Sequence, residues 1–161
     1  MRHVILCDLD NTVVNTNPQI GERVLGFTTS VYPFPLPPDF FEKNPDVFRH
    51  AHPFPGAAQT LRAWVSTGHS LYYVTARGEW SRQLTSEWLH QHHFPMAPLI
   101  FSCEKDVIAH DIKATIAFED SPGEIDKLSE IIPTIFVHEM TYNRSYKNRF
   151  RCWHDIFGKV V

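Results

Sequence analysis

The sequence lacks the features of a membrane protein, a disulfide-rich scaffold or a nucleic-acid carrier. It has no long apolar run, and from Arg2 it enters a short strand-like segment that already contains an acid, unlike a signal peptide or a membrane span. Its three cysteines, Cys7, Cys103 and Cys152, are odd in number and lack metal-type spacing. Its net charge is only −3. We therefore expect a soluble cytoplasmic protein with no membrane partner and no nucleic-acid partner.

What is present is an alternation of apolar strand-like runs and helical patterns over 161 residues, a length typical of one domain. The alternation predicts an α/β fold, a Rossmann-like three-layer sandwich whose mostly parallel central sheet is covered on both faces. The core helices are expected at residues 57–66, 79–92 and 123–131. The expected strands are residues 3–8, 70–75, 97–102, 115–119 and 134–138.

A long segment between the first two expected strands, residues 15–55, is rich in proline and aromatic residues. Connections of this length are usually functional or disordered, and the aromatic content argues against disorder. We interpret it as a small cap inserted into a core of residues 1–14 and 56–161, with helices near 19–27 and 39–50. Most cap aromatics are expected to form the cap's own core, and one or two to line a pocket.

Two carboxylates, Asp8 and Asp10, stand at the end of the first expected strand, followed by Asn11 and Thr12. Ionised carboxylates are costly to bury without partners. A hard divalent ion such as Mg²⁺ removes that cost, because it prefers oxygen ligands and keeps positions for a substrate phosphate. The alternative is a polar turn, where Asx and Thr residues are common. The metal interpretation is favoured if segments far away in the sequence supply further groups that bind a phosphate or a metal.

The next two strand ends supply groups that suit a phosphate. Thr75 ends the second strand, and its hydroxyl and the backbone amides that follow at Ala76 and Arg77 suit phosphate oxygens, although Thr is also a common helix N-cap. Lys105 follows the third strand and would neutralise a nucleophilic carboxylate and a transferring phosphoryl group. Lys113 is the competing lysine, and the place of Lys105 just past a strand end favours Lys105.

The fourth strand ends in Glu119 and Asp120. As with Asp8 and Asp10, two ionised carboxylates at the end of a buried strand are costly without a partner. Asp120 would complete a metal site, and Glu119 would orient Lys105. The alternative is that Asp120, Ser121 and Pro122 only cap the next helix. Both interpretations can hold at once.

Taken together, these groups resemble, in order and strand position, the four motifs of the haloacid dehalogenase (HAD) superfamily. The resemblance implies a phosphatase in which Asp8 attacks phosphorus to form an aspartyl-phosphate and Asp10 serves as general acid and base. It implies Mg²⁺ as the cofactor. The ligands would be Asp8, the Asp10 backbone carbonyl and Asp120, the phosphate would bind Thr75, Ala76 and Lys105, and Thr12, Arg77 and Glu119 would support them.

The end of the chain, with Tyr142-Asn143 and residues 151–156, is similar to that of the 5′(3′)-deoxyribonucleotidase-like branch. Glu119 departs from that branch, which tends to have aspartate there. We expect a small phosphorylated substrate, with a (deoxy)nucleoside monophosphate as first candidate. The alternatives are a sugar phosphate or other small metabolite, and a non-catalytic regulatory domain that binds metal and phosphate. The oligomeric state stays open.

Two other groups of side chains have simpler interpretations. The histidines at 50 and 52 and at 90, 92 and 93 lack the spacing of a structural zinc site, so we expect surface or loop histidines. The basic residues at 144, 147, 149 and 151 are expected to form a solvated face rather than a nucleic-acid site.

Overall fold

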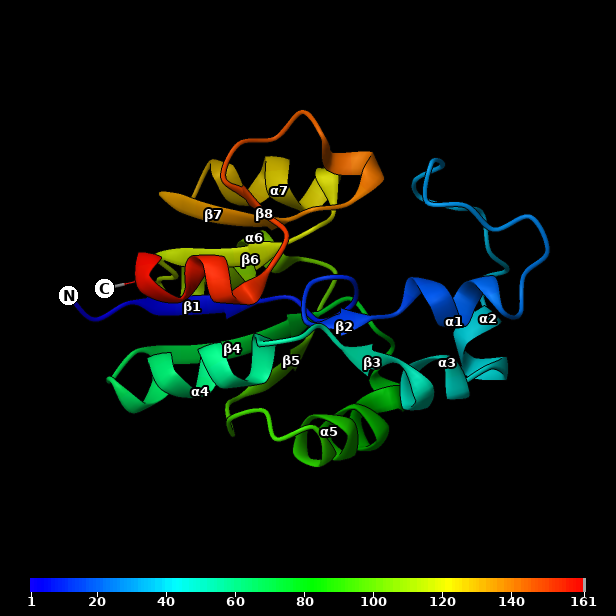
Figure 1. Cartoon of the computed structure of the whole chain (residues 1–161), viewed down its shortest axis with the longest axis horizontal. Coiled ribbons are helices and arrows are strands. Elements are labelled where there is room, and N and C mark those ends of the chain that lie inside the picture. Colours follow the sequence, from blue (N-terminus) through cyan, green and yellow to red (C-terminus); the bar gives the residue numbers. More distant parts are fainter. Residues whose placement is uncertain (161) are drawn as a thin grey trace.

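The computed structural model describes residues 1–160, which form a central sheet with helices on both faces and a cap beyond one end of the strands (Figure 1). The sheet has six strands in the order β5-β4-β1-β6-β7-β8, all paired in parallel. This confirms the predicted α/β fold class. The strands are β1 (Val4–Cys7), β4 (Ser70–Thr75), β5 (Leu99–Phe101), β6 (Ile116–Glu119), β7 (Thr134–His138) and β8 (Arg149–Phe150).

Side chains alternate between the two faces of the sheet, because successive residues of a strand point to opposite sides. Ile5 and Cys7 of β1 are buried with residues of α4, α5 and η3, whereas Leu6 between them is buried with residues of α6 and α7. Both faces are covered, which explains why the strands are continuous apolar runs. The helices are α4 (Ala57–Ser66), α5 (Arg82–Gln91), α6 (Lys105–Asp111), α7 (Pro122–Ser129) and the 3₁₀ helix η3 (Trp153–Lys159).

The expected core elements agree with the structure except at some ends. The strands expected at 70–75 and 134–138 coincide with β4 and β7, and the helix expected at 57–66 coincides with α4. The helix expected at 79–92 begins as a 3₁₀ turn, η1 (Glu79–Ser81), before α5. Strand β8 was not expected, because two residues are too few to show an alternating pattern. Among residues 1–160, no helix has both the length and the apolar character that crossing a bilayer requires.

Residues 15–55 fold over the carboxyl ends of the central strands (Figure 1). Two short strands, β2 (Val14–Asn15) and β3 (His52–Pro53), pair antiparallel where the segment leaves and rejoins the core. Between them lie three short helices, of which α1 contains Pro18 in its first turn. These helices are α1 (Asn17–Gly21), α2 (Phe40–Lys43) and α3 (Asp46–His50).

Two helix predictions in this segment were wrong. The helix expected at 19–27 begins earlier and ends at Gly21, since Pro18 favours a start beside it. The single helix expected at 39–50 is two helices, because Pro45 disfavours helical backbone at the preceding residue, Asn44.

The cap has a small apolar core of its own. Phe40 and Phe48 are buried together with Ile20 and Val47, and Phe41 packs against them. The expectation that cap aromatics pack mainly against one another is confirmed at these positions. Tyr32, Phe41 and Phe48 also line the cavity between the cap and the sheet.

Candidate active site

A cavity of about 530 Å³ lies between the cap and the carboxyl ends of the central strands. Neighbouring strands β4, β1 and β6 end at its floor, so the residues that follow them meet there although they lie far apart in the sequence. The charged and polar residues that line it are Asp8, Asp10, Asn11, Thr16, Glu42, Thr75, Arg77, Lys105, Glu119, Asp120, Ser121 and Glu124.

Lys105, at the start of α6, joins two of the carboxylates. Its Nζ lies 2.6 Å from Asp8 Oδ1 and 2.7 Å from Glu119 Oε2, and the residue is 2% exposed. Burial lowers the pKa of Lys105, but the Asp8 and Glu119 carboxylates outweigh it and hold that pKa above its ordinary value. Lys113, the competing lysine, lies in the turn before β6, at the opposite end of that strand.

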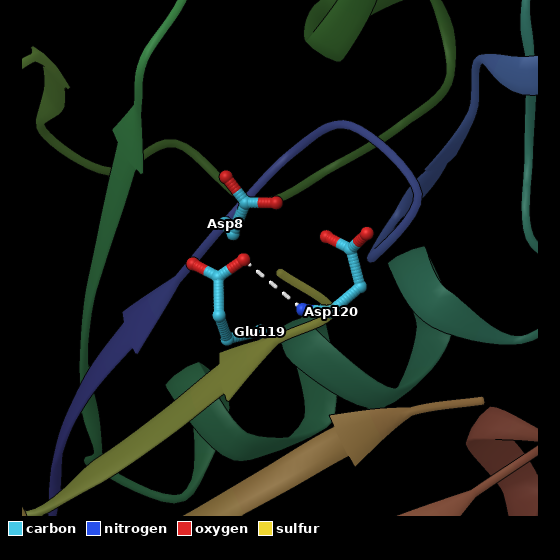
Figure 2. Close-up of side chains that lie close together, drawn as sticks. All are labelled: Asp8, Glu119 and Asp120. Atoms are coloured by element: carbon cyan, nitrogen blue, oxygen red, sulfur yellow. Dashed lines mark hydrogen bonds between the residues drawn. The ribbon is translucent and has the colours of Figure 1, made fainter. Parts of the chain in front are cut away.

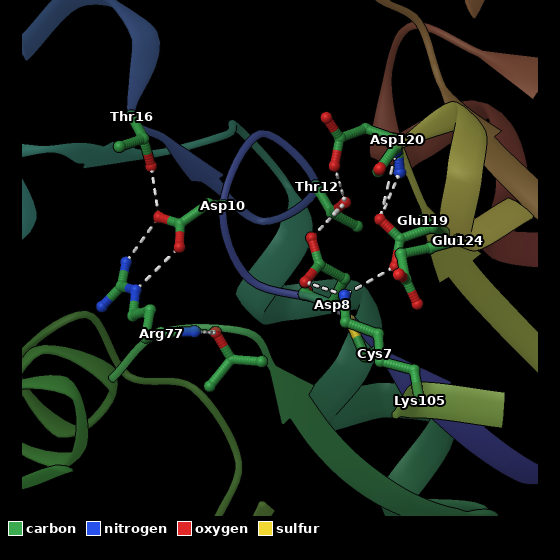
Figure 3. A network of polar contacts seen from close by, with 12 residues as sticks. Cys7, Asp8, Asp10, Thr12, Thr16, Arg77, Lys105, Glu119, Asp120 and Glu124 are labelled. Carbon is green, nitrogen blue, oxygen red and sulfur yellow. Dashed lines mark hydrogen bonds and ion pairs between the residues drawn. The ribbon is translucent and has the colours of Figure 1, made fainter. Parts of the chain in front are cut away.

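Glu119 is turned inward and is fully buried. Its Oε1 accepts a hydrogen bond from the backbone N–H of Asp120 at 3.0 Å (Figure 2) and another from that of Ser121 at 3.1 Å. Its Oε2 faces Lys105 (Figure 3). Glu119 therefore fixes both Lys105 and the backbone that carries Asp120.

Asp8, Glu119 and Asp120 form an acidic cluster in which one carboxylate oxygen of each residue lies within 4.8 Å of the other two (Figure 2). Burial, followed by the Glu119 charge, raises the pKa of Asp8 to about 7. Burial and the Glu119 and Asp8 charges also raise the pKa of Asp120 well above its ordinary value. Three carboxylates against the single ammonium of Lys105 leave two negative charges without a counterpart when all three are ionised.

The hydroxyl of Thr12 lies between two of these carboxylates and cannot satisfy both. Thr12 Oγ1 lies 3.1 Å from Asp8 Oδ2 and 3.2 Å from Asp120 Oδ1. A hydroxyl has one proton, so it cannot donate to both carboxylates at once. A divalent cation with oxygen ligands fits this arrangement, because it would supply the missing charge and a partner for the remaining oxygen. The cluster is therefore a candidate divalent-metal site.

The two histidine groups of the sequence do not form a comparable set of metal ligands among the described residues. In the part of the chain that the structure describes, the acidic cluster is the one set of three or more candidate metal ligands, so the histidines at 50, 52, 90, 92 and 93 do not gather into another.

Asp10 lies apart from the cluster, with its side chain turned toward Arg77 and Thr16 (Figure 3). Arg77 Nε is 2.8 Å from Asp10 Oδ2, and Arg77 Nη2 is 2.7 Å from Oδ1. Burial alone would raise the pKa of Asp10, but the Arg77 guanidinium and the Thr16 hydroxyl hold that pKa below its usual value. The pKa of Asp10 is thus shifted in the opposite direction from that of Asp8.

Thr75 lies at the carboxyl end of β4 and is 1% exposed. Its Oγ1 accepts a hydrogen bond from the backbone N–H of Arg77 at 3.2 Å, which fixes the turn that contains Ala76. Both Thr75 and Ala76 line the cavity. The structure therefore brings all the expected site residues to one cavity or its wall, and their chemical roles stay predictions.

Three residues at the site had no role in the sequence reasoning. Thr16 Oγ1 lies 2.5 Å from Asp10 Oδ1, and the Tyr142 hydroxyl donates to Asp120 Oδ2. Glu124 lines the cavity, and its Oε2 is buried without a hydrogen-bond partner among residues 1–160. Glu124 stands in the first turn of the helix that directly follows Asp120, which was an available signal for a second acid near the site.

One wall of the cavity is aromatic. The rings of Phe41 and Phe48 stack with centroids 4.9 Å apart, and those of Phe48 and Trp80 with centroids 6.1 Å apart. Tyr32, which also lines the cavity, stacks on Tyr142 with centroids 4.1 Å apart. The organic part of a ligand would meet flat apolar surfaces there.

The whole chain resembles a solved hydrolase structure. A HAD hydrolase of family IA from Entamoeba histolytica superposes with a TM-score of 0.65, over 97% of this chain and 95% of that protein, at 14% identity. The chain has the haloacid dehalogenase fold. A model of the LNS2 domain of PITM 1-3 also matches, over residues 40–118, a range that contains neither Asp8 nor Asp120.

Two curated relatives of this HAD-fold chain carry the name "Putative nucleotidase". The protein from Oceanobacillus iheyensis is 30% identical over 109 residues, which are 63% of this chain and 58% of that protein. The protein from Bacillus cereus is 30% identical over 115 residues, which are 68% of this chain and 60% of that protein. The chain thus spans about three fifths of the length of the curated relatives it matches.

Proposed function

We propose that this chain is a Mg²⁺-dependent phosphomonoesterase that forms an aspartyl-phosphate on Asp8, with a nucleoside monophosphate as its substrate. The observation that carries the proposal is the setting of Asp8. It is 5% exposed, it lines the cavity at a strand end, and it has an ammonium on one oxygen and the acidic cluster beside it. Such a carboxylate is positioned to attack an electrophile and is costly to keep for packing alone.

Each site residue has a defined task in this proposal. Asp8 attacks phosphorus in line, and its new O–P bond forms as the bond to the leaving oxygen breaks. Lys105, Thr75 and the amide of Ala76 bind the phosphoryl oxygens. Asp10 gives a proton to the leaving oxygen and then takes one from the attacking water.

The metal would be held by the carboxylates of Asp8 and Asp120 and by the Asp10 carbonyl. When bound, Mg²⁺ supplies the positive charge that lets a carboxylate approach a phosphate of like charge. Glu119 stays with Lys105, and Tyr142 and Thr12 orient the two ligating carboxylates.

The nucleotide part of the proposal rests on the cap and on the relatives. The aromatic wall of Phe41, Phe48 and Trp80 suits a flat ring, since stacked rings gain about 0.5–1.5 kcal/mol beyond the area that they bury. The two relatives that are 30% identical to this chain over the matched residues carry the name "Putative nucleotidase".

The test is phosphate release from nucleoside, deoxynucleoside and sugar monophosphates and from p-nitrophenyl phosphate, each with Mg²⁺ and with EDTA. Asp8→Asn is the inactive variant, and Asp111→Asn, which changes an exposed aspartate, is its matched control. Release that needs both Mg²⁺ and Asp8 and prefers nucleotides supports the proposal.

Two other outcomes contradict parts of it. A preference for sugar phosphates would keep the mechanism and remove the nucleotide assignment. Folded protein that binds Mg²⁺ but releases no phosphate from any substrate would make the chain a binding module.

A further inference from the structure

The carboxylate of Asp10 has almost all of its acceptor positions occupied. Its Oδ1 faces two donors, Arg77 Nη2 at 2.7 Å and Thr16 Oγ1 at 2.5 Å. Its Oδ2 faces one donor, Arg77 Nε at 2.8 Å. A carboxylate has about four lone-pair positions. One position, on Oδ2, is therefore left for a further partner, and 27% of the Asp10 side chain is exposed.

Arg77 is itself held by two partners besides Asp10, so it can fix Asp10 rather than follow it. Its side chain is only 2% exposed, and its Nη1 donates to Thr85 Oγ1 of α5 at 3.0 Å. The ring of Phe48, from the cap, covers the guanidinium with 3.8 Å between its centroid and the guanidinium carbon. The planar group is thus held between core and cap, with its Nε–H and one Nη2–H directed at the two oxygens of Asp10.

This arrangement differs from what a phosphate-binding arginine requires. All three guanidinium nitrogens of Arg77 already have partners within the chain, at Asp10 and Thr85. Since the side chain is also only 2% exposed, its two remaining N–H groups are not open to a ligand. Arg77 therefore acts on Asp10, and not directly on the phosphoryl oxygens that Lys105 and Thr75 would bind.

We propose that Arg77, together with Thr16, is a positioning residue that fixes Asp10 as the base for hydrolysis of the phosphoenzyme. The inference rests on the proposed function. In this step a water proton moves to the free position on Asp10 Oδ2, and the water oxygen forms a bond to phosphorus. The bond between phosphorus and the Asp8 oxygen breaks, and its electron pair returns to the Asp8 carboxylate. Inorganic phosphate leaves, and Asp10 holds the proton.

The closing experiment compares the two half-reactions with p-nitrophenyl phosphate, whose leaving group departs without a proton. Arg77→Lys keeps the charge but cannot bridge both Asp10 oxygens and reach Thr85. We expect kcat to fall by about 100-fold, with a burst of about one p-nitrophenolate per enzyme before slow turnover. Intact mass after acid quenching should show most of the enzyme phosphorylated at steady state. Asp10→Asn should show the same pattern.

Two more variants separate positioning from folding. Thr16→Val removes one donor at nearly constant volume, and it should raise the phosphorylated fraction less than Arg77→Lys does. Arg82→Lys is the matched control, since Arg82 also pairs with an acid and stacks over a ring, Phe101, but lies outside the cavity. It should leave both the burst and kcat unchanged.

Three results would overturn the inference. In the first, Arg77→Lys slows turnover without a change in the phosphorylated fraction, as a merely structural role predicts. In the second, it raises only KM. In the third, it changes nothing. If the wild-type protein releases no p-nitrophenolate, the proposed function fails instead. A crystal structure of Arg77→Lys then decides, because an Asp10 side chain that keeps its place would show that Arg77 does not position it.

Discussion

Replacing Asp8 with asparagine should make the metal-free protein more stable, although it weakens a buried ion pair. Burial and the charge of Glu119 raise the pKa of Asp8 to about 7 in the folded chain. The unfolded value is about 3.9, so the folded chain binds this proton more tightly than the unfolded chain. The stability that the proton confers is complete below about pH 4 and is lost as the pH rises to about 7.

The size of the effect follows from that shift. A difference of about three pKa units, at about 1.4 kcal/mol each, gives an upper bound of about 4 kcal/mol above pH 7. The raised pKa of Asp8 already includes the favourable charge and hydrogen bond of Lys105, so only the imperfect match of a neutral amide to the carboxyl group is subtracted, at a cost of about 1–2 kcal/mol. The expected net gain for Asp8→Asn is therefore about 2 kcal/mol in the free energy of unfolding.

Urea unfolding with EDTA, at about pH 8 and about pH 5, measures this difference. The gain should be present at the higher pH and close to zero at the lower, because about two of the three pKa units of stabilisation by the Asp8 proton are restored by about pH 5. Asp111→Asn, at an exposed position, controls for the chemical change. A loss of more than about 1 kcal/mol for Asp8→Asn at pH 8 would refute the reasoning, because it would mean that the ionised carboxylate stabilises the fold.

Three further predictions concern neighbouring groups. Lys105→Met should lower the free energy of unfolding by about 3–5 kcal/mol in chemical denaturation, since it leaves two buried carboxylates without their cation. Tyr142→Phe should weaken Mg²⁺ binding about 10-fold in calorimetry, because the hydroxyl no longer orients Asp120, and an unchanged Kd would contradict this role. Trp80→Leu should raise KM about 5-fold for a nucleoside monophosphate and leave that for glycerol phosphate unchanged, which kinetics with both substrates would test.

The sheet could be predicted because its signals are local. Strand β4 and strand β7 are apolar runs with polar flanks, and their expected bounds coincide with the structure. The cap gave weaker signals, because its helices and strands are only two to five residues long and are stabilised by contacts with one another. Strands β2 and β3 have two residues each and pair across the whole insertion, so no window of sequence contains the pattern. Pro45, in contrast, was a readable signal against the single long helix.

The meeting of the site residues could also be predicted, since it follows from topology alone. Lys105 and Asp8 are 97 positions apart, yet each follows a parallel strand at the same edge of the sheet. Lys113 precedes β6 and so lies at the other edge. The choice between the two lysines therefore depended on which end of a strand each one adjoins.

What the sequence could not give is the direction in which a side chain at that edge points. Arg77 stands two residues after Thr75 and was expected only to support the site, and it turns to Asp10 because Thr85 and Phe48 hold its plane. Both partners come from other elements, α5 and the cap. The two acids of the first motif consequently have opposite surroundings. Without a metal, burial and like charges favour the protonated form of Asp8, whereas the Arg77 guanidinium favours the ionised form of Asp10, although the two acids stand only two positions apart.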